Sequence, residues 1–181
     1  MESLLPRSGK SSPVILVLGG ARSGKSRFAE SLLADHVGQR TYLATAEAGD
    51  EEMRERIRHH RERRAASWRT IEAPIDLATP IADAGEAAVL IDCLTLWLSN
   101  LMAAGRDVDE ATQGLCQALD RAKAPVVLVS NETGLGIVPD NALAREFRDN
   151  AGRLNQAIAA RADRVFFIAA GLPLTLKDNA A

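Results

Sequence analysis

Short runs of apolar residues alternate along this chain with longer segments in which apolar residues recur at helical spacing. Continuous apolar or β-branched runs of about five residues are typical of buried strands in a parallel sheet. They predict strands over residues 14–18, 40–46, 68–72, 88–92, 125–132 and 164–170, and a short edge strand over 172–177. Apolar positions three and four residues apart predict helices. The predicted helices cover residues 27–34, 51–66, 75–84, 94–103, 109–123 and 141–162.

Strands that alternate with helices predict a largely parallel sheet covered on both faces. The longest predicted helix has apolar residues along one side, which are Leu143, Phe147, Leu154 and Ile158. Because no solenoid repeat and no linker interrupts the pattern, we expect residues 14–181 to form one α/β domain. Residues 1–13 are rich in Ser, Pro and Gly and have no apolar h-region, which predicts a disordered extension rather than a secretory signal.

The stretch that joins the first predicted strand to the first helix consists of Gly19, Gly20, Ala21, Arg22, Ser23, Gly24, Lys25 and Ser26. It fits the phosphate-binding pattern G-x-x-x-x-G-K-[ST], and the strand before it and the helix after it are the context that the motif requires. Backbone N–H groups of such a loop surround phosphate oxygens at the helix N-terminus. Lys25 is expected to reach the β- and γ-phosphates, and the Ser26 hydroxyl to bind Mg²⁺.

The last five residues of this loop also occur earlier in the chain, at positions 7–11. The earlier copy has Leu4 where the motif requires the first glycine, no strand precedes it, and Pro13 follows closely. The later copy is therefore the predicted phosphate site, and the earlier one belongs to the extension.

Composition and charge argue against several classes of function. The formal net charge is −2, so no overall basic field indicates nucleic-acid binding. No apolar stretch is long enough to span a bilayer. The two cysteines, Cys93 and Cys116, lack the spacing of a metal site and indicate reduced thiols in the cytoplasm.

Polar or small residues follow several predicted strands, and ligands of open α/β sheets bind beyond the carboxyl ends of the strands. Strand 88–92 ends in Asp92, in the position of the acid that holds Mg²⁺, directly or through water, in phosphate-loop enzymes. Ala44, Thr45 and Ala46 are candidates by position alone, and a plain strand end explains them equally well. The loop over residues 133–140 is too apolar for a simple solvated turn, which indicates contact with a partner or a ligand.

The predicted helix over residues 51–66 is rich in arginine and carries two adjacent histidines. Its apolar stripe is thin and consists of Met53 and Ile57. At about 100° per residue, His60 falls on this stripe and His59 falls well away from it, towards solvent or a site. The arginines favour a solvated face, and the alternative is a clamp for phosphates, which guanidinium groups bind bidentately.

Several of these segments together resemble the bifunctional adenosylcobinamide kinase / adenosylcobinamide-phosphate guanylyltransferase family of cobalamin (vitamin B12) biosynthesis. The resemblance runs from Val14 to about Lys177. Its segments are the phosphate loop and residues 44–45, 56–60, 68–72, 92–95, 131–139 and 145–156. The paired histidines and the 131–139 loop are far more specific than the phosphate loop, which many families share.

The resemblance implies a P-loop NTPase (RecA-like) fold and two reactions in one protein. In the first, ATP or GTP phosphorylates the aminopropanol hydroxyl of adenosylcobinamide. In the second, GTP transfers its GMP to adenosylcobinamide phosphate, which leaves adenosylcobinamide-GDP and releases pyrophosphate. The resemblance also implies a homotrimer, and the apolar residues 134–138 are consistent with a subunit interface.

The family's first paired histidine becomes covalently guanylylated, and that position is His59 here. Further nucleotide contacts carry over to the phosphate loop and to Ala44, Thr45, Ala46, Arg61, Glu62, Arg63, Arg64, Glu72 and Asp92. The carboxylate of Glu72 suits the N1–H and the exocyclic amine of guanine. Asp92 stands where relatives carry Glu, and its shorter side chain favours a water-mediated metal contact. Residues 61–64 also lack a glycine that relatives can have.

The chemistry agrees with these roles, because a neutral imidazole is a competent nucleophile near pH 7 and can form a phosphoramidate. Two alternatives stay open on the residues alone. A single-function P-loop kinase of small molecules requires Lys25, Ser26 and Asp92 but not His59. A non-catalytic or motor-type nucleotide switch requires a partner-facing surface. Neither alternative predicts a nucleotide bound covalently to the protein.

Overall fold

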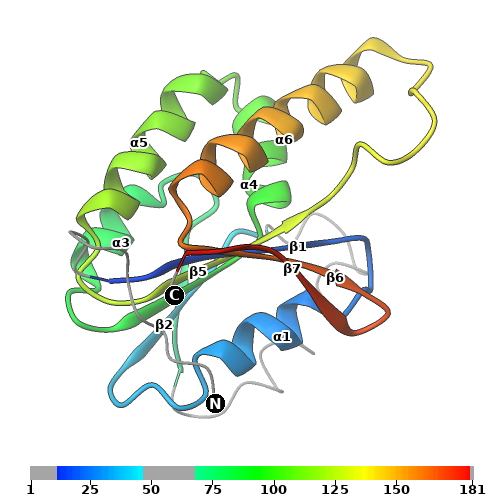
Figure 1. Ribbon diagram of the computed structural model, residues 1–181. Coiled ribbons are helices and arrows are strands. Elements are labelled where there is room, and N and C mark those ends of the chain that lie inside the picture. Colours follow the sequence, from blue (N-terminus) through cyan, green and yellow to red (C-terminus); the bar gives the residue numbers. More distant parts are fainter. Residues whose placement is uncertain (1–11, 47–67, 180–181) are drawn as a thin grey trace.

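Seven strands form the centre of the fold, in the order β3-β2-β4-β5-β1-β6-β7 (Figure 1). The computed structural model describes residues 12–46 and 68–179. The strands are β1 Val14–Gly19, β2 Arg40–Ala44, β3 Trp68–Glu72, β4 Ala88–Asp92, β5 Val126–Asn131, β6 Arg164–Ala169 and β7 Leu172–Asp178. The helices are α1 Lys25–Leu32, α3 Ala78–Asp83, α4 Leu94–Ala103, α5 Val108–Arg121 and α6 Ala142–Arg161.

The first six strands are parallel, so all of their carboxyl ends lie along one edge of the sheet. Strand β7 is antiparallel to β6 and closes the sheet at one side. A two-residue turn joins β6 to β7, with φ of 52° at Ala170 and 80° at Gly171. Positive φ at both central residues matches the twist of paired strands, which explains how the chain reverses here within two residues.

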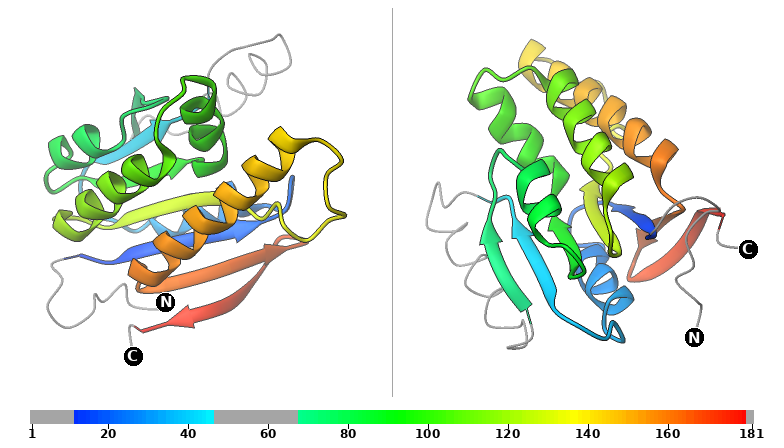
Figure 2. Two further views of the ribbon diagram at one scale, coloured as in Figure 1. Left: turned by 90° about the horizontal axis from the view of Figure 1, so that it is seen from above. Right: turned by 90° about the vertical axis from the view of Figure 1, so that its left-hand side faces the viewer.

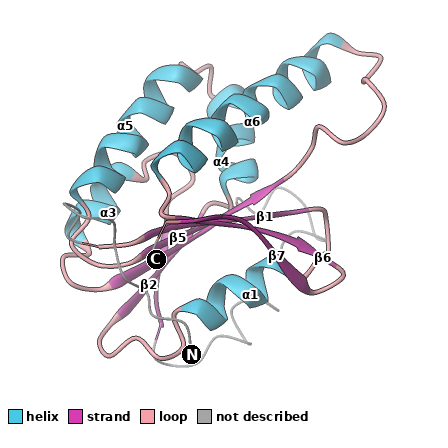
Figure 3. Ribbon diagram, viewed as in Figure 1, coloured by secondary structure: helices cyan, strands magenta, loops and turns pink. Residues whose placement is uncertain are grey.

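Helix α1 covers one face of the sheet, and α3 to α6 form a layer on the other (Figures 2 and 3). The side chains of β1 alternate between two apolar clusters: Ile15 and Val17 pack on the α1 side, and Val14 and Leu16 pack towards α4 to α6. Both faces of the central strands are therefore buried, which is the physical reason for their unbroken apolar sequence.

The predicted alternation of strands and helices is confirmed within the described residues, with local differences at the ends of the elements. Strand β2 ends at Ala44, two residues early, and α3 begins at Ala78 instead of residue 75. The carbonyl of Ile75 accepts a hydrogen bond of 2.6 Å from Trp97 Nε1, so it does not begin an intrahelical ladder. Leu143, on the apolar side of α6, is 67% exposed because the first turn of this helix projects away from the sheet (Figure 1).

The predicted disordered extension ends earlier than expected. Ser12 and Pro13 are buried, and the carbonyl of Pro13 accepts a 3.0 Å hydrogen bond from Val126 N. These two residues therefore belong to the folded domain, because they continue the pairing of β1 with β5. The remainder of the extension, residues 1–11, and the predicted helix over residues 51–66 lie outside the described residues.

Candidate functional site

The phosphate loop leaves the sheet at Gly19 and enters α1 at Lys25. A Cβ atom on Gly19 would lie 2.6 Å from both the carbonyl oxygen of Ile168 and Ser23 Oγ, so only glycine fits between β6 and the loop. Gly24 precedes α1 with a φ of 98°, and no side chain caps the helix there. The first turn of α1 also contains no acidic residue. The N–H groups of this turn thus carry the partial positive charge of a helix N-terminus without a competing carboxylate.

Lys25 folds back over the loop that precedes it. Its side chain is largely buried, and Nζ donates a 3.0 Å hydrogen bond to the carbonyl of Gly20. The Lys25 charge also acts on Cys93, directly after β4. Burial, followed by the charge of Asp92, raises the pKa of the Cys93 thiol to about 11, and Lys25 acts in the opposite direction. Cys93 is therefore a neutral thiol rather than a nucleophile.

Asp92, Ala44 and Glu72 end three neighbouring strands at the same level, because Ala44 pairs in register with Asp92 on one side and with Glu72 on the other. Register partners in a parallel sheet point to the same face. Ala44 packs in the apolar cluster on the α1 side of the sheet, so the side chains of Glu72 and Asp92 also point to that face. At a strand spacing of about 4.8 Å, the backbones of Glu72 and Asp92 are about 10 Å apart, with only the methyl group of Ala44 between them.

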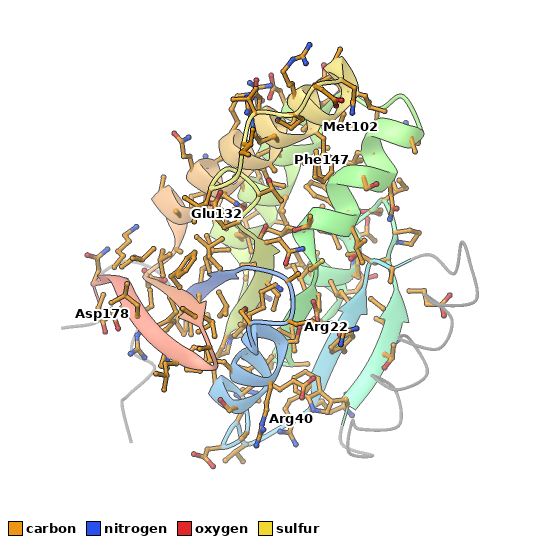
Figure 4. All side chains as sticks on the ribbon, turned by 90° about the vertical axis from the view of Figure 1, so that its right-hand side faces the viewer. Arg22, Arg40, Met102, Glu132, Phe147 and Asp178 are labelled. Carbon is orange, nitrogen blue, oxygen red and sulfur yellow. The ribbon has the colours of Figure 1, made fainter. Side chains whose placement is uncertain are left out.

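Asp92 and the phosphate loop belong to strands that are not adjacent, because β5 lies between β4 and β1. This order places Asp92 two strand spacings, about 10 Å, from Val17 on β1, and Gly19 lies two residues further towards the carboxyl edge. Figure 4 views the molecule from the carboxyl ends of the strands, with Arg22 on the phosphate loop and Glu132 directly after β5. The structure thus brings the loop, Ala44, Glu72 and Asp92 to one edge of the sheet.

The side chain of Thr45 has a structural role, and its contact with a nucleotide stays a prediction. Its side chain is fully buried, and Oγ1 accepts a hydrogen bond from Cys93 N and donates one to Cys93 O, both 2.8 Å long. Asn100 Nδ2 donates to the carbonyls of Thr45 at 2.8 Å and Pro74 at 3.0 Å. The hydroxyl of Thr45 therefore fastens the end of β2 to the bend after β4, where the Asp92–Cys93 peptide bond is cis.

The sequence analysis missed three elements that hold the site. Tyr42 Oη donates a 2.9 Å hydrogen bond to Asp92 Oδ2. The turn between β6 and β7 supports the phosphate loop, because Gly171 N donates to the carbonyl of Ser23 at 2.9 Å. The end of β5 is held from the helical layer, since Asn131 N donates to Thr95 Oγ1 at 2.7 Å. Of these three elements, only the turn between β6 and β7 has a local signal in the sequence, which is its Ala170-Gly171 pair.

The remaining predicted residues fall into two groups. Ala21, Arg22 and Gly24 are exposed on the phosphate loop, and Ser26 and Ala46 are half-buried. The predicted nucleophile and arginine segment lie outside the described residues: His59, Arg61, Glu62, Arg63 and Arg64. Their contacts with the nucleotide stay predictions.

The oxygen donors at this edge suit Mg²⁺. Asp92 supplies a carboxylate and Ser26 a hydroxyl, and Mg²⁺ typically binds one or two carboxylates together with substrate phosphates and waters. Within residues 12–46 and 68–179, no group of three or more His, Cys, Asp or Glu side chains forms a cage that would hold a metal alone. The site therefore fits a metal that arrives with a nucleotide.

A cavity of about 440 Å³ lies beside β3 and α3 and meets the site at Glu72. Tyr42 and Trp68 pack on the α1 side of the sheet. Thr41 and Arg69 line the cavity and are the neighbours of these residues along each strand, so their side chains point to the opposite face. The cavity therefore lies on the face opposite α1. The pKa of Asp76 on its rim is lowered, chiefly by the side-chain hydrogen bond of Thr79. The phosphate-binding loop and this cavity are therefore on different faces of the sheet.

The strand order and the phosphate loop together define a P-loop NTPase of the RecA-like type. Solved structures agree with this class at the level of the fold. An ATPase from the type III secretion system of pathogenic bacteria matches with a TM-score of 0.59 and 12% identity over 95% of this chain and 58% of its own. The assembled ATPase EscN from the type III secretion system of enteropathogenic E. coli matches with a TM-score of 0.57 and 11% identity over 88% of this chain and 43% of its own.

Sequence comparisons identify the family within this class. A family model described as cobinamide kinase / cobinamide phosphate guanyltransferase matches residues 15–176. The bifunctional adenosylcobalamin biosynthesis protein CobP of Pseudomonas aeruginosa is 51% identical, with 91% of this chain and 97% of that protein covered. CobU of Salmonella typhimurium, a protein of the same description, is 46% identical, with 91% and 99% covered. The chain belongs to the cobinamide kinase / cobinamide phosphate guanylyltransferase family, whose members are bifunctional enzymes of cobalamin biosynthesis.

None of the helices in the described part of the chain combines the length and the apolar character that crossing a membrane requires.

Proposed function

We propose that this enzyme phosphorylates adenosylcobinamide with ATP or GTP and then transfers GMP from GTP to adenosylcobinamide phosphate. The products of the second reaction are adenosylcobinamide-GDP and pyrophosphate. The family description and the names of the relatives support this pair of reactions. The observation that carries the proposal is the convergence of the phosphate loop, Lys25 and Asp92 at one edge of the sheet.

In the kinase reaction, the substrate hydroxyl oxygen attacks the γ-phosphorus, the bond to the bridging oxygen breaks, and the hydroxyl proton passes to solvent. Lys25 and the N–H groups at the start of α1 stabilise negative charge on the transferring group. Mg²⁺, held by Ser26 and Asp92, supplies further charge neutralisation when it is bound. The protein contributes position and electrostatics, so this reaction requires no covalent intermediate.

The guanylyl transfer consists of two displacements at one phosphorus atom. An imidazole nitrogen of His59 attacks the α-phosphorus of GTP, and the bond to the leaving pyrophosphate breaks. A phosphate oxygen of the second substrate then attacks the guanylyl-histidine, and the phosphorus–nitrogen bond breaks to restore His59. Dividing the transfer in this way replaces one difficult step by two easier ones.

Glu72 is proposed to select guanine. Its carboxylate can accept hydrogen bonds from the N1–H and the exocyclic amine, a pair of donors that adenine does not present. Its place beside Ala44 supports this role, because the small side chain leaves space between the two acidic strand ends.

The decisive experiment incubates the enzyme with GTP labelled at the α-phosphate, denatures it, and measures acid-labile label on the protein. His59→Ala should bind nucleotide and keep much of its kinase activity, but lose the label and the second product. His60→Ala is the matched control and should keep the label, at some cost in stability. Absence of label from the wild-type enzyme would favour a single-function kinase, and loss of label in His60→Ala alone would identify the other histidine as nucleophile.

We also propose that the enzyme forms a homotrimer through an apolar loop surface. This surface consists of four exposed residues, which are Leu135 (81% exposed), Ile137 (97%), Val138 (63%) and Leu143 (67%). Contiguous exposed apolar residues usually mark an interface. Ile137→Glu should lower the mass measured by sedimentation equilibrium from trimer towards monomer. Val37→Glu is the matched control, because Val37 is equally exposed at 97% but lies in the loop that follows α1, away from this surface.

Three further assignments complete the proposal. Residues 14–181, together with Ser12 and Pro13 directly before β1, act as one catalytic domain, since the described part of this range shares a single sheet. The net charge of −2 supports small-molecule substrates rather than nucleic acid. The enzyme works in the cytoplasm, where nucleoside triphosphates are supplied.

A further inference from the structure

Tyr42 is the side chain that donates a hydrogen bond to the Asp92 carboxylate. It lies on β2 with only 3% of its surface exposed, and its register partner on β4 is Leu90, two residues before Asp92. The ring therefore leans towards the carboxyl edge of the sheet, where Oη donates to Asp92 Oδ2 at 2.9 Å. No other hydrogen bond reaches the Asp92 carboxylate from residues 12–46 or 68–179.

We propose that Tyr42 is a positioning residue for metal binding: it holds Oδ2 of Asp92 so that Oδ1 faces the metal-bound nucleotide. A phenol has a single proton to donate, and a bond to an ionised carboxylate is charge-assisted. Outer-shell partners of this kind orient metal ligands, and their loss typically lowers metal affinity about 10- to 100-fold. The inference rests on the proposed function in one respect, which is the assignment of Asp92 as a metal ligand.

The ring of Tyr42 is itself held by an aromatic and cationic stack. Trp68 meets it edge to face, with ring centroids 6.2 Å apart and an interplanar angle of 85°. The guanidinium carbon of Arg40 lies 5.3 Å from the centre of the Trp68 ring. Arg40 also donates to the carbonyls of Leu33 at 3.2 Å and Ala34 at 3.4 Å, at the end of α1. One stack thus supports Asp92 and the helix that begins with Lys25 and Ser26.

A positioning role matters more here because the acid is aspartate. A carboxylate on one methylene has fewer orientations than glutamate, but its reach towards a metal is shorter. A fixed Oδ1 can accept a hydrogen bond from a metal-bound water or bind the ion directly without first being ordered. Tyr42 removes the competing orientation by occupying Oδ2.

The test measures the affinity of a fluorescent GTP analogue across a range of Mg²⁺ concentrations and in EDTA. Tyr42→Phe keeps the ring and removes only the hydroxyl. We expect the Mg²⁺ concentration for half of the metal-dependent gain in affinity to rise at least about tenfold. Affinity in EDTA should stay within about twofold of wild type, because the phosphate loop is unchanged. Thr112→Val is the matched control, since it also removes one buried hydroxyl and its 2.7 Å hydrogen bond, to Val108 O in α5.

The Asp92→Asn background separates the possible results. If Tyr42 acts through Asp92, Tyr42→Phe should cause no further shift in Mg²⁺ dependence in that background. An equal shift in both backgrounds, or an unchanged half-point in Tyr42→Phe alone, would overturn the inference. A Tyr42→Phe variant that loses affinity equally in EDTA and in Mg²⁺ would indicate a merely structural role. If Asp92→Asn itself leaves Mg²⁺ dependence unchanged, the metal assignment of the proposed function has failed instead.

Discussion

Replacing Thr45 by valine tests whether this residue acts on the nucleotide or on the fold. Valine has nearly the same shape but no hydroxyl. The N–H of Cys93, which donates to Thr45 Oγ1 at 2.8 Å, would be left without that partner in a buried position. The carbonyl of Cys93 keeps a second hydrogen bond, from Trp97 N at 3.1 Å, so it loses only the bond from the threonine.

The magnitude follows from these two losses. An orphaned buried N–H costs about 1–3 kcal/mol, and a lost bond to a carbonyl that is still paired costs about 0.5–1.5 kcal/mol. The additional buried methyl group of valine offsets up to about 0.8 kcal/mol. We therefore expect the free energy of unfolding to fall by about 2–3 kcal/mol. For a domain of this size, that corresponds to a decrease in Tm of about 4–12 °C.

The assay is urea unfolding followed by tryptophan fluorescence and by far-ultraviolet circular dichroism, which must give coincident transitions. Thr45→Ser is the control, because it keeps both hydrogen bonds and loses one methyl group, for about 1 kcal/mol. The reasoning is refuted if Thr45→Val changes the unfolding free energy by less than about 0.5 kcal/mol while nucleotide affinity falls. In that case the hydroxyl would contact the nucleotide, as position alone indicated.

Four further outcomes are expected. Lys25→Ala should abolish both activities, because both require a triphosphate at the loop. Lys10→Ala, in the earlier copy of the motif, should leave turnover unchanged. Near-normal kinase turnover in Lys25→Ala would show that the phosphate site is assigned wrongly. With a pKa of about 11, Cys93 should resist thiol reagents at pH 8, where about one thiol in a thousand is ionised, and react readily once urea unfolds the protein. Between pH 9 and about pH 11 the folded state binds more protons at this thiol than the unfolded state, so urea midpoints should decrease as pH rises, and Cys93→Ala should reduce that slope. Gly24→Ala should lower the free energy of unfolding, measured by chemical denaturation, by about 1–2 kcal/mol. The reason is that φ at Gly24 is 98° and the new Cβ would lie 3.3 Å from Gly171 Cα. An unchanged denaturation midpoint would contradict this backbone geometry.

The pattern of apolar residues determined the order and type of the described elements. A strand buried on both faces must be apolar at successive positions, and the run over residues 14–18 has this property whatever lies beside it. The phosphate loop could also be identified from the sequence, because its glycines and Lys25 lie within eight consecutive residues. Asp92 could be located as a candidate in the same way, since it is the last residue of an apolar strand.

Only the tertiary structure decided which strands are neighbours and what each polar side chain contacts. The sequence contains no local signal that β5 separates β4 from β1, because pairing joins residues more than a hundred positions apart, such as Leu16 and Leu128. The same limit applies to Tyr42 and Asp92, and to Thr45 and Cys93, whose separations along the chain are 50 and 48 residues. The exposure of Leu143 could not be read from the sequence either, because periodicity reports which side of a helix is apolar and not where the helix leaves the sheet. The apolar pattern is a property of neighbouring residues in the sequence, whereas contacts are set by the packing of distant segments, and that packing determines which residues form this site.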